Sequence, residues 1–547
     1  MALRIEDYAL IGDCQTAALV GRDGSIDWLC LPRFDSAACF AALLGSPGNG
    51  RWRIAPAGEV SKSRRRYVGN TLVLETEFEA EAGAVAVTDF MPVREAVPDL
   101  VRVVEGRRGT VPVRSELVIR PDYGSVVPWV QKVDGGLSAV AGPDAFRLRS
   151  PVPNHGENLS TVAEFTVAAG QRVPFVLTYH RSYDAVPEPI DPEAALTDTL
   201  AWWEAWAGRC TYAGVRKDLV VRSLITLKAM TFAPSGGVVA APTAALPEFI
   251  GGVRNWDYRY CWLRDATLTL LALLNCGYTD EAGAWRGWLL RAVAGDPSKL
   301  QIMYGVGGER RLDEYEVPWL GGYEGSKPVR VGNAAHAQFQ LDVYGEVADA
   351  LHLSRAGGLR TAPAEWALEK ALVRFVAGAW AEPDEGIWEV RGPRRHFTHS
   401  KVMAWVALDR AIKSAERFGL DGPLGRWRAL RAAIHDRVCR EGFSPRVGSF
   451  VQSFAARART CPASQAITDS RSLSPRPERL TSSTWRRESA GARFIASATA
   501  WALSSAGRMP SVSARRWNAA TASRSSTAVY SIRPRSCSQA CSGPIAG

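Results

Sequence analysis

Apolar and polar residues alternate along the first third of the chain. In "RRYVGNTLVLETEFEAEAGAVAVTDFMPV" (65–93) the period is two and the alternation breaks at Gly or Asn, which is typical of short paired strands. "ELVIRPDYG", "FRLRS" and "STVAEFTVAAGQRVPFVLTYH" continue the pattern to about His180. Short strands separated by frequent turn residues favour a sandwich over a parallel sheet. We therefore predict a β-sandwich over residues 1–185.

The apolar period changes from two to between three and four after residue 185. Asp191 is suited to cap a helix whose first residue is Pro192, and we predict a linker helix within 186–214. Further helices are predicted near 215–233, 264–276, 279–295, 333–353, 364–379, 399–418 and 422–438. Because long Gly- and aromatic-rich loops join them, an all-α (α/α)6 barrel over 215–454 is favoured over a plain bundle.

Residues 455–547 have a different composition. This tail contains 19 Ser, 14 Arg, no Lys and three acidic residues. It accounts for the chain's net positive charge, because the total is +10 and residues 1–454 sum to −1. Disorder is one explanation, and out-of-frame translation of a GC-rich gene is the other. We favour the frameshift, which would leave the barrel incomplete at its C-terminal end.

The remaining composition is that of a globular protein in a reducing compartment. No export signal precedes the first strands, and no apolar run of membrane-spanning length occurs. The ten cysteines are scattered without paired spacing, and Cys30, Cys39 and Cys276 have apolar neighbours. We expect a cytoplasmic protein with reduced thiols and no membrane partner. A basic tail alone gives nonspecific nucleic-acid affinity, so no specific nucleic-acid partner is expected.

Residues 251–277, "GGVRNWDYRYCWLRDATLTLLALLNCG", hold the densest aromatic cluster. Sugars are bound by flat apolar faces together with paired polar groups, and the aromatics from Trp256 to Trp262 precede Arg264 and Asp265. The same pattern fits a core aromatic cluster with Asp265 as a helix N-cap. Residue spacing alone favours the core cluster.

Two further segments contain candidate site residues. In 381–411, Glu389 follows Trp388 in a loop before a helix. An indole beside a carboxylic acid desolvates it and raises its pKa towards neutrality, although a loop Glu is more often a solvated surface residue. In 316–346, Trp319 and Tyr323 lie on a Gly-rich loop, which fits either a sugar-facing loop or a packed turn.

Other chemistries have weaker support in the sequence. There is no phosphate-binding loop and no nucleophile elbow. The seven His lack metal-ligand spacing, and His396 and His399 are interpreted as structural or substrate-facing. We expect neither a metal nor a cofactor.

Together these segments resemble glycoside hydrolase family 15, in the bacterial branch with a trehalase-like N-terminal domain. The resemblance is carried by "IEDYALIGDCQTAALVGRDGSIDWLCLPRFDS", "RNWDYRYCWLRDA", "QIMYGVGGERRLDEYEVPWLGGYEGSKPVRVGNAA", "GIWEVRG" and "GSFVQSF", in the family's order over about 450 residues. It ends near Phe454. It implies a β-sandwich followed by an (α/α)6 barrel, and inverting hydrolysis of an α-glucosidic bond in trehalose or in malto- or isomalto-oligosaccharides.

The resemblance also implies roles for individual residues. Glu389 falls where the family keeps its general acid, and Arg264 and Asp265 fall where it grips the terminal glucosyl unit. Ile387 and Trp388 line the same subsite, and Trp319 and Tyr323 correspond more loosely.

The family's general base lies in a late "EEY"-like motif, which is absent here. The chain as it stands is therefore expected to be inactive, and a sugar-binding protein without turnover is the alternative. A glucosyl saccharide is the expected ligand, and the sequence leaves both its identity and the oligomeric state open.

Overall fold

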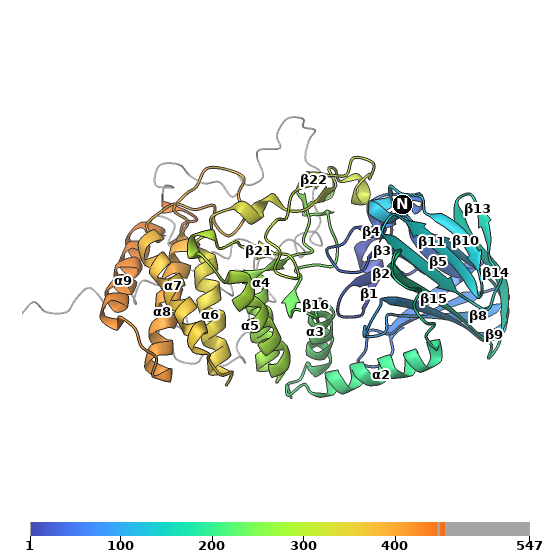
Figure 1. The fold of residues 1–547 in the computed structure, drawn as a ribbon, viewed down its shortest axis with the longest axis horizontal. Helices are drawn as coiled ribbons and strands as arrows, with labels where there is room; N and C mark the ends of the chain where they lie inside the picture. Colours follow the sequence, from blue (N-terminus) through green and yellow to red (C-terminus); the bar gives the residue numbers. More distant parts are fainter. Residues whose placement is uncertain (1, 446–448, 455–547) are drawn as a thin grey trace, which may run out of the picture. The chain divides into compact units, whose positions relative to one another are not determined.

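A computed structural model describes residues 2–445 and 449–454. The expected nature of the 455–547 tail therefore lies outside the described residues. Figure 1 shows strands in the N-terminal part of the described chain and mainly helices in the rest. The chain divides into two compact units. The first comprises residues 1–295, 300–337 and 356–359, and the second comprises 296–299, 338–355 and the residues from 360 onward.

The first unit begins with a large antiparallel sheet domain. Its strands are β1 (Tyr8–Gly12), β2 (Ala17–Gly21), β3 (Ser25–Cys30), β4 (Ala38–Phe40), β5 (Arg51–Pro56), β6 (Val60–Tyr67), β7 (Leu74–Ala80), β8 (Gly83–Phe90), β9 (Asp99–Val118), β10 (Trp129–Val133), β11 (Gly136–Ala141), β12 (Asp144–Arg149), β13 (His155–Glu157), β14 (Ser160–Ala168) and β15 (Arg172–Arg181). The central order is β1-β2-β3-β5-β9-β15-β12-β11-β10. The sheet domain that the alternation predicted is confirmed.

Strand β9 belongs to two sheets. Its first half pairs with β8 and β15, and its second half pairs with β5 and β14. Side chains from both sheets pack into one core, which includes Trp52, Val104, Val113 and Phe146. One 20-residue strand therefore joins the two sheets around a shared core.

Helix α2 (Pro192–Gly208) follows the sheets. The Asp191 carboxylate accepts hydrogen bonds from the N–H groups of Glu193 (2.9 Å) and Ala194 (3.2 Å), and Pro192 is the first helical residue. The predicted cap is confirmed, because these bonds satisfy two N–H groups that have no partner within the helix.

The rest of the described chain is mainly helical. Its helices are α3 (Lys217–Ala229), α4 (Leu263–Asn275), α5 (Thr279–Val293), α6 (Asp342–Ala356), α7 (Pro363–Ala379), α8 (Thr398–Phe418) and α9 (Leu424–Arg437). The short helix α1 (Pro121–Gly124) lies in the sheet domain. Two-residue strands lie in the connections, namely β16 (Thr231–Phe232), β17 (Gly237–Val238), β18 (Leu246–Pro247), β19 (Asn255–Trp256), β20 (Cys261–Trp262), β21 (Met303–Tyr304), β22 (Tyr315–Glu316), β23 (Arg330–Val331), β24 (Phe443–Ser444) and β25 (Ser449–Phe450).

Helix α6 begins nine residues later than the predicted start at 333. A 3-10 turn occupies Ala334–Ala337, and the next residues bond to another loop of the same unit. The N–H of Phe339 donates to a Glu385 carboxylate oxygen (2.9 Å), and that of Leu341 donates to an Asp384 carboxylate oxygen (3.1 Å). Because these two N–H groups are bonded to side chains of another loop, the helix begins only at Asp342.

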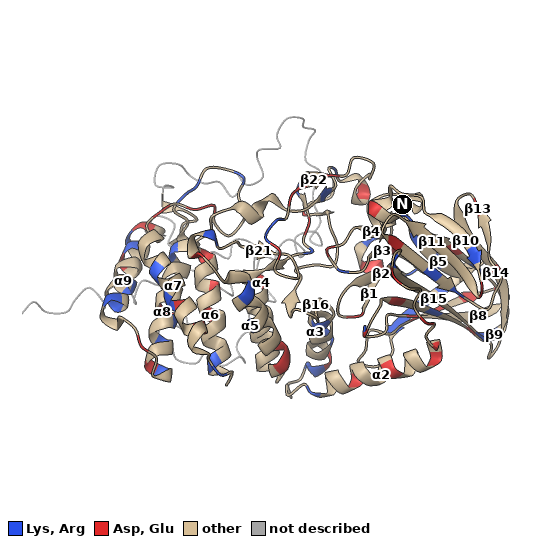
Figure 2. Cartoon of the chain, viewed as in Figure 1, with Lys and Arg blue, Asp and Glu red and all other residues tan. Residues whose placement is uncertain are grey.

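The charged side chains and the cysteines of the described residues have ordinary environments. Figure 2 shows Lys and Arg interspersed with Asp and Glu on the strands and helices, as in the ion pairs Arg66–Glu75 and Arg428–Glu416. Cys30, Cys39 and Cys276 are buried free thiols, as predicted. Within residues 2–445 and 449–454, no helix combines the length and apolarity needed to span a bilayer.

Candidate active site

The predicted site residues fall into both compact units. Arg264, Asp265, Trp319 and Tyr323 belong to the first unit, and residues 387–389 belong to the second. Each group is held by its own set of contacts.

The aromatic segment of the first unit leads from β19 through β20 into helix α4. Its residues alternate between two environments. Asp257 and Arg259 are fully buried, whereas Trp256 and Tyr258 are half-buried. The rings of Tyr258 and Trp262 lie 5.5 Å apart between centroids. An extended chain turns successive side chains to opposite faces, so Asp257 and Arg259 anchor one face. The aromatic face is half-buried at Trp256 and Tyr258 and is buried further along, at Tyr260 and Trp262.

The anchor is an ion pair that sequence reasoning missed. Arg259 Nη2 lies 2.7 Å from Asp257 Oδ2. The same guanidinium donates to the Tyr123 hydroxyl (2.8 Å) and the Ser36 carbonyl (2.6 Å), both in the sheet domain. Asp257 also accepts from the N–H of Gly332 (3.1 Å). A buried charge pair with its remaining groups hydrogen-bonded fixes one geometry. The available signal was an acid and a base two residues apart, on one side of an extended segment.

Arg264 and Asp265 lie in the first turn of α4. Arg264 Nε is 3.2 Å from Asp265 Oδ1, and both side chains are partly exposed. The N-cap position is Trp262, without a side-chain cap, so Asp265 is not the N-cap that the core-cluster alternative required. An acid in the first turn is favourable beside the positive end of the helix dipole. The pair is thus an accessible, oppositely charged couple that follows the aromatic segment.

Trp319 and Tyr323 have different environments on their shared loop. Trp319 is 47% exposed, and its Nε1 donates to the Tyr123 carbonyl (3.0 Å). Tyr323 is buried in a core cluster, and its hydroxyl donates to the Leu3 carbonyl (3.1 Å). Tyr323 therefore packs as a turn residue, whereas Trp319 presents an aromatic face held by one hydrogen bond.

In the second unit, Ile387, Trp388 and Glu389 occupy a closed loop. Asp384 and Arg395 form its base, with reciprocal backbone bonds of 3.0 and 2.9 Å. The N–H of Glu389 donates to the Gly386 carbonyl (3.2 Å), which closes a tight turn. Ile387 is buried, Glu389 is half-buried and Trp388 is 50% exposed. Ile387 therefore anchors a turn that leaves Trp388 half exposed to solvent.

Glu389 has a left-handed backbone, with φ of 52°. A non-glycine residue in this region costs about 1–2 kcal/mol. Such strain persists only where the surroundings enforce it, and it is concentrated at functional sites. The surroundings here are the turn to Gly386 and the closed base of the loop.

The base of the loop contains buried ionisable groups. Glu385 accepts from the Phe339 N–H and from Arg394 Nε, both at 2.9 Å. Burial raises the pKa of Asp384 to about 6, and the nearby Asp342 carboxylate adds to the shift. Burial lowers the pKa of Lys401 to about 8. Glu385 and Asp384 accept hydrogen bonds from the N–H groups of Phe339 and Leu341, so they position the loop.

One of the two histidines near this loop has a clear packing contact. His396 stacks on Phe454 with 6.4 Å between ring centroids, which fits a structural role. In the part of the chain that the structure describes, no group of three or more His, Cys, Asp or Glu side chains is placed to hold a metal ion.

Two family models match the chain. The model of glycosyl hydrolases family 15 matches residues 214–478, and that of the trehalase-like N-terminal domain matches residues 1–189. The first match extends to residue 478, beyond Phe454, where we had predicted from the sequence that the resemblance ends.

Similar proteins include trehalases from bacteria and archaea. The trehalase of Mycolicibacterium smegmatis is 34% identical over 476 residues, which cover 81% of this chain and 70% of that protein. The trehalase of Thermoplasma volcanium is 32% identical, covering 83% and 74%. Among solved structures, a bacterial glucoamylase complexed with acarbose matches with a TM-score of 0.56 at 11% identity, covering 80% of this chain and 66% of that one. This likeness shows that the fold is glucoamylase-like.

Proposed function

The chain belongs to glycosyl hydrolase family 15, and on that basis we propose that its site is built to hydrolyse trehalose at the α-glucosidic bond with inversion, releasing glucose. The observation that carries the proposal is the carboxylate of Glu389, held in a strained left-handed turn of a closed loop beside an accessible indole. Trehalose is preferred over malto- and isomalto-oligosaccharides because similar proteins of several organisms are trehalases.

The residues take complementary roles in this proposal. Glu389 protonates the glycosidic oxygen as the bond breaks. Arg264 and Asp265 hydrogen-bond the hydroxyls of the glucosyl unit. The exposed rings of Trp319 and Trp388 cover its C–H faces, and Ile387 supports the loop from below. Tyr323, which is buried, positions the loop that carries Trp319.

The sequence lacks the motif in which the family's general base lies. An inverting enzyme needs a second carboxylate about 6.5–9.5 Å from the acid, to activate water on the opposite face of the sugar. The sequence has no "EEY"-like motif, and its composition changes after Phe454. We therefore expect the chain as it stands to bind sugar without useful turnover, with a partial (α/α)6 barrel over 215–454 and a frameshifted tail. A dedicated sugar-binding protein is the second candidate, favoured by the same missing base.

The first experiment compares the chain as it stands with a version whose reading frame is restored near codon 454. Both are assayed for glucose release from trehalose, maltose and isomaltose. We expect turnover of trehalose by the corrected version alone. Turnover by the unmodified chain would overturn the missing-base argument. Binding without turnover in both versions would favour the sugar-binding protein.

The second experiment tests the general acid in the corrected version. Glu389→Gln should lower kcat by about 10²–10⁴-fold, the usual contribution of general acid–base catalysis. The matched control is Glu382→Gln, because Glu382 is an exposed carboxylate near the same loop. A change in KM alone would show that Glu389 only binds substrate.

The third experiment tests the glucosyl grip. Arg264→Ala should lower kcat/KM by an amount that corresponds to a loss of about 2–5 kcal/mol in transition-state stabilisation. This is the loss expected when a charged hydrogen-bonding partner is removed. Arg22→Ala serves as the control, because Arg22 forms only a surface ion pair with Asp7, and such pairs contribute little. A folded Arg264→Ala variant with unchanged kcat/KM would exclude this role.

A further inference from the structure

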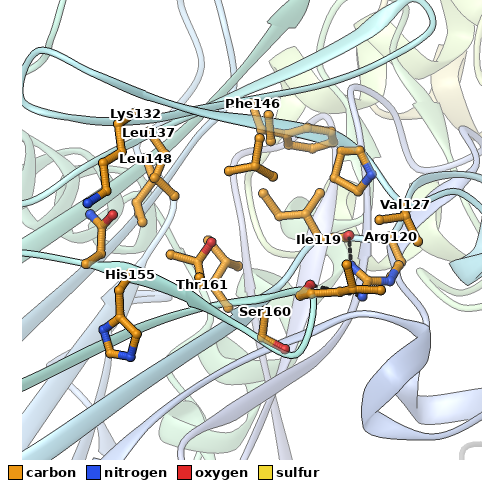
Figure 3. Close-up of a pocket in the computed structure, with 17 residues that line it drawn as sticks. Ile119, Arg120, Val127, Lys132, Leu137, Phe146, Leu148, His155, Ser160 and Thr161 are labelled. Carbon is orange, nitrogen blue, oxygen red and sulfur yellow. Dashed lines mark hydrogen bonds between the residues drawn. The ribbon is translucent and has the colours of Figure 1, made fainter.

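A cavity of about 380 Å³ lies within the sheet domain, and none of the residues assigned above lines it. Buried apolar side chains from both sheets form part of its wall, and Figure 3 shows polar side chains such as His155 and Thr161 beside them. The apolar side chains include Leu117 of β9, Leu137 and Ala139 of β11, and Phe146 and Leu148 of β12. The volume falls in the lower part of the roughly 300–1,000 Å³ range of small-molecule sites.

Apolar side chains also lie at the mouth of the cavity. Val127, Val130 and Leu159 line it and are exposed to solvent. Exposed apolar side chains that lie together can mark a site where a ligand or partner binds. The cavity therefore has a buried apolar wall and exposed apolar side chains at its mouth. Polar residues also line it, namely Lys132, Asn154, His155, Ser160 and Thr161.

One buried cation contributes to the cavity. Arg120 is 7% exposed, and its guanidinium donates to the carbonyls of Ile119 (2.8 Å) and Leu159 (3.0 Å). Burial lowers its pKa, although arginine still carries its charge at neutral pH. None of the 17 lining residues is Asp or Glu, and among the described residues no ion pair to Arg120 is found.

A buried charge without a counter-ion is costly, and two carbonyl bonds use only two of the five guanidinium N–H groups. An anion at this position would both neutralise the charge and use remaining donors, because the guanidinium fork matches a carboxylate. Lys132 also lines the cavity but is exposed, so water already solvates its charge.

We propose that this cavity binds an aliphatic carboxylate, with the carboxylate on Arg120 and the hydrocarbon chain against Leu137, Phe146 and Leu148. The small volume selects medium-length chains. The site is independent of the hydrolytic residues and of the substrate assigned above.

The first test uses calorimetric titration of the full chain with octanoate and, separately, with 1-octanol. The two probes share their hydrocarbon chain and differ in charge. Octanoate should bind about ten- to hundredfold more tightly, which is the factor that a hydrogen bond to a charged group supplies. Arg120→Met, which keeps an unbranched apolar side chain but removes the guanidinium and its charge, should remove that preference. Equal binding of both probes to the unmodified chain would overturn the role of Arg120.

The second test varies the length of the hydrocarbon. Each methylene from hexanoate to decanoate should tighten binding about fourfold, the equivalent of about 0.8 kcal/mol. Ala139→Phe should fill the cavity and abolish binding, with circular dichroism checking the fold. Should that variant misfold, Leu148→Ala is the substitute, and it should shift the preferred chain to a longer one. Absence of binding at millimolar concentration, or binding that neither wall variant changes, would overturn the proposal.

Discussion

Gly386→Ala tests whether the loop that carries Glu389 depends on its glycine. Gly386 has φ of 72°, and an added Cβ would lie 2.5 Å from Cδ2 of Phe397. The left-handed backbone costs alanine about 1–2 kcal/mol. The contact cannot be relieved cheaply, because the Phe397 ring is 6% exposed, and overpacking of this kind costs about 1–3 kcal/mol. We expect a loss of about 2–5 kcal/mol in the free energy of unfolding.

Gly392→Ala is the matched control in the same loop. Its Cβ would meet only Cγ1 of Val390, at 3.5 Å, which is ordinary van der Waals contact. The control should lie within about 0.5 kcal/mol of the unmodified chain. Urea unfolding followed by tryptophan fluorescence measures both variants, and glucose release by the frame-corrected chain shows whether the displaced turn also lowers kcat. Equal stability of the two variants would refute the argument from φ and from the Phe397 contact.

Two further predictions concern buried charges. Burial raises the pKa of Asp384 to about 6, above the value of about 3.9 in the unfolded chain. Protonated Asp384 therefore stabilises the folded chain fully below pH 4, and this stabilisation is lost as the pH rises through 6. The free energy of unfolding should fall by about 3 kcal/mol over that range. Asp384→Asn should remove this fall between pH 4 and 6.5 in urea unfolding, and an unchanged pH profile would contradict the assignment. Asp257→Asn should cost about 3–5 kcal/mol, because it leaves the buried charge of Arg259 uncompensated. Pairing it with Arg259→Met should cost less than the two single losses together, and strictly additive losses in a double-mutant cycle would show that the pair is not coupled.

The sequence predicted most helices because their own periodicity and end signals determine them. Helix α8 was predicted over 399–418 and spans Thr398–Phe418, where Gly419 ends it in a left-handed conformation. The late start of α6 was not predictable in this way. It depends on Asp384 and Glu385, which lie more than 40 residues further along the chain and capture the N–H groups of Leu341 and Phe339.

The candidate site was predictable in composition but not in conformation. Motif resemblance identified Glu389 and Arg264, but no local rule predicts a left-handed glutamate, because the turn to Gly386 and the loop's closure impose it. The ion pair of Asp257 and Arg259 was not predicted, because the interpretation of this segment rested on its aromatic residues. Their role depends on contacts with Tyr123 and Ser36, which lie far away in sequence.

The double membership of β9 has a consequence for synthesis on the ribosome. The strand is complete at Val118, but its partners β14 and β15 end only at Ala168 and Arg181. At about 5–20 residues per second, some 60 further residues take roughly 3–12 seconds to emerge. During that interval β9 has unpaired edges in both sheets, and unpaired edges are sites of aggregation. Slower translation just after β9 should therefore lower the yield of folded protein more than slower translation after β15.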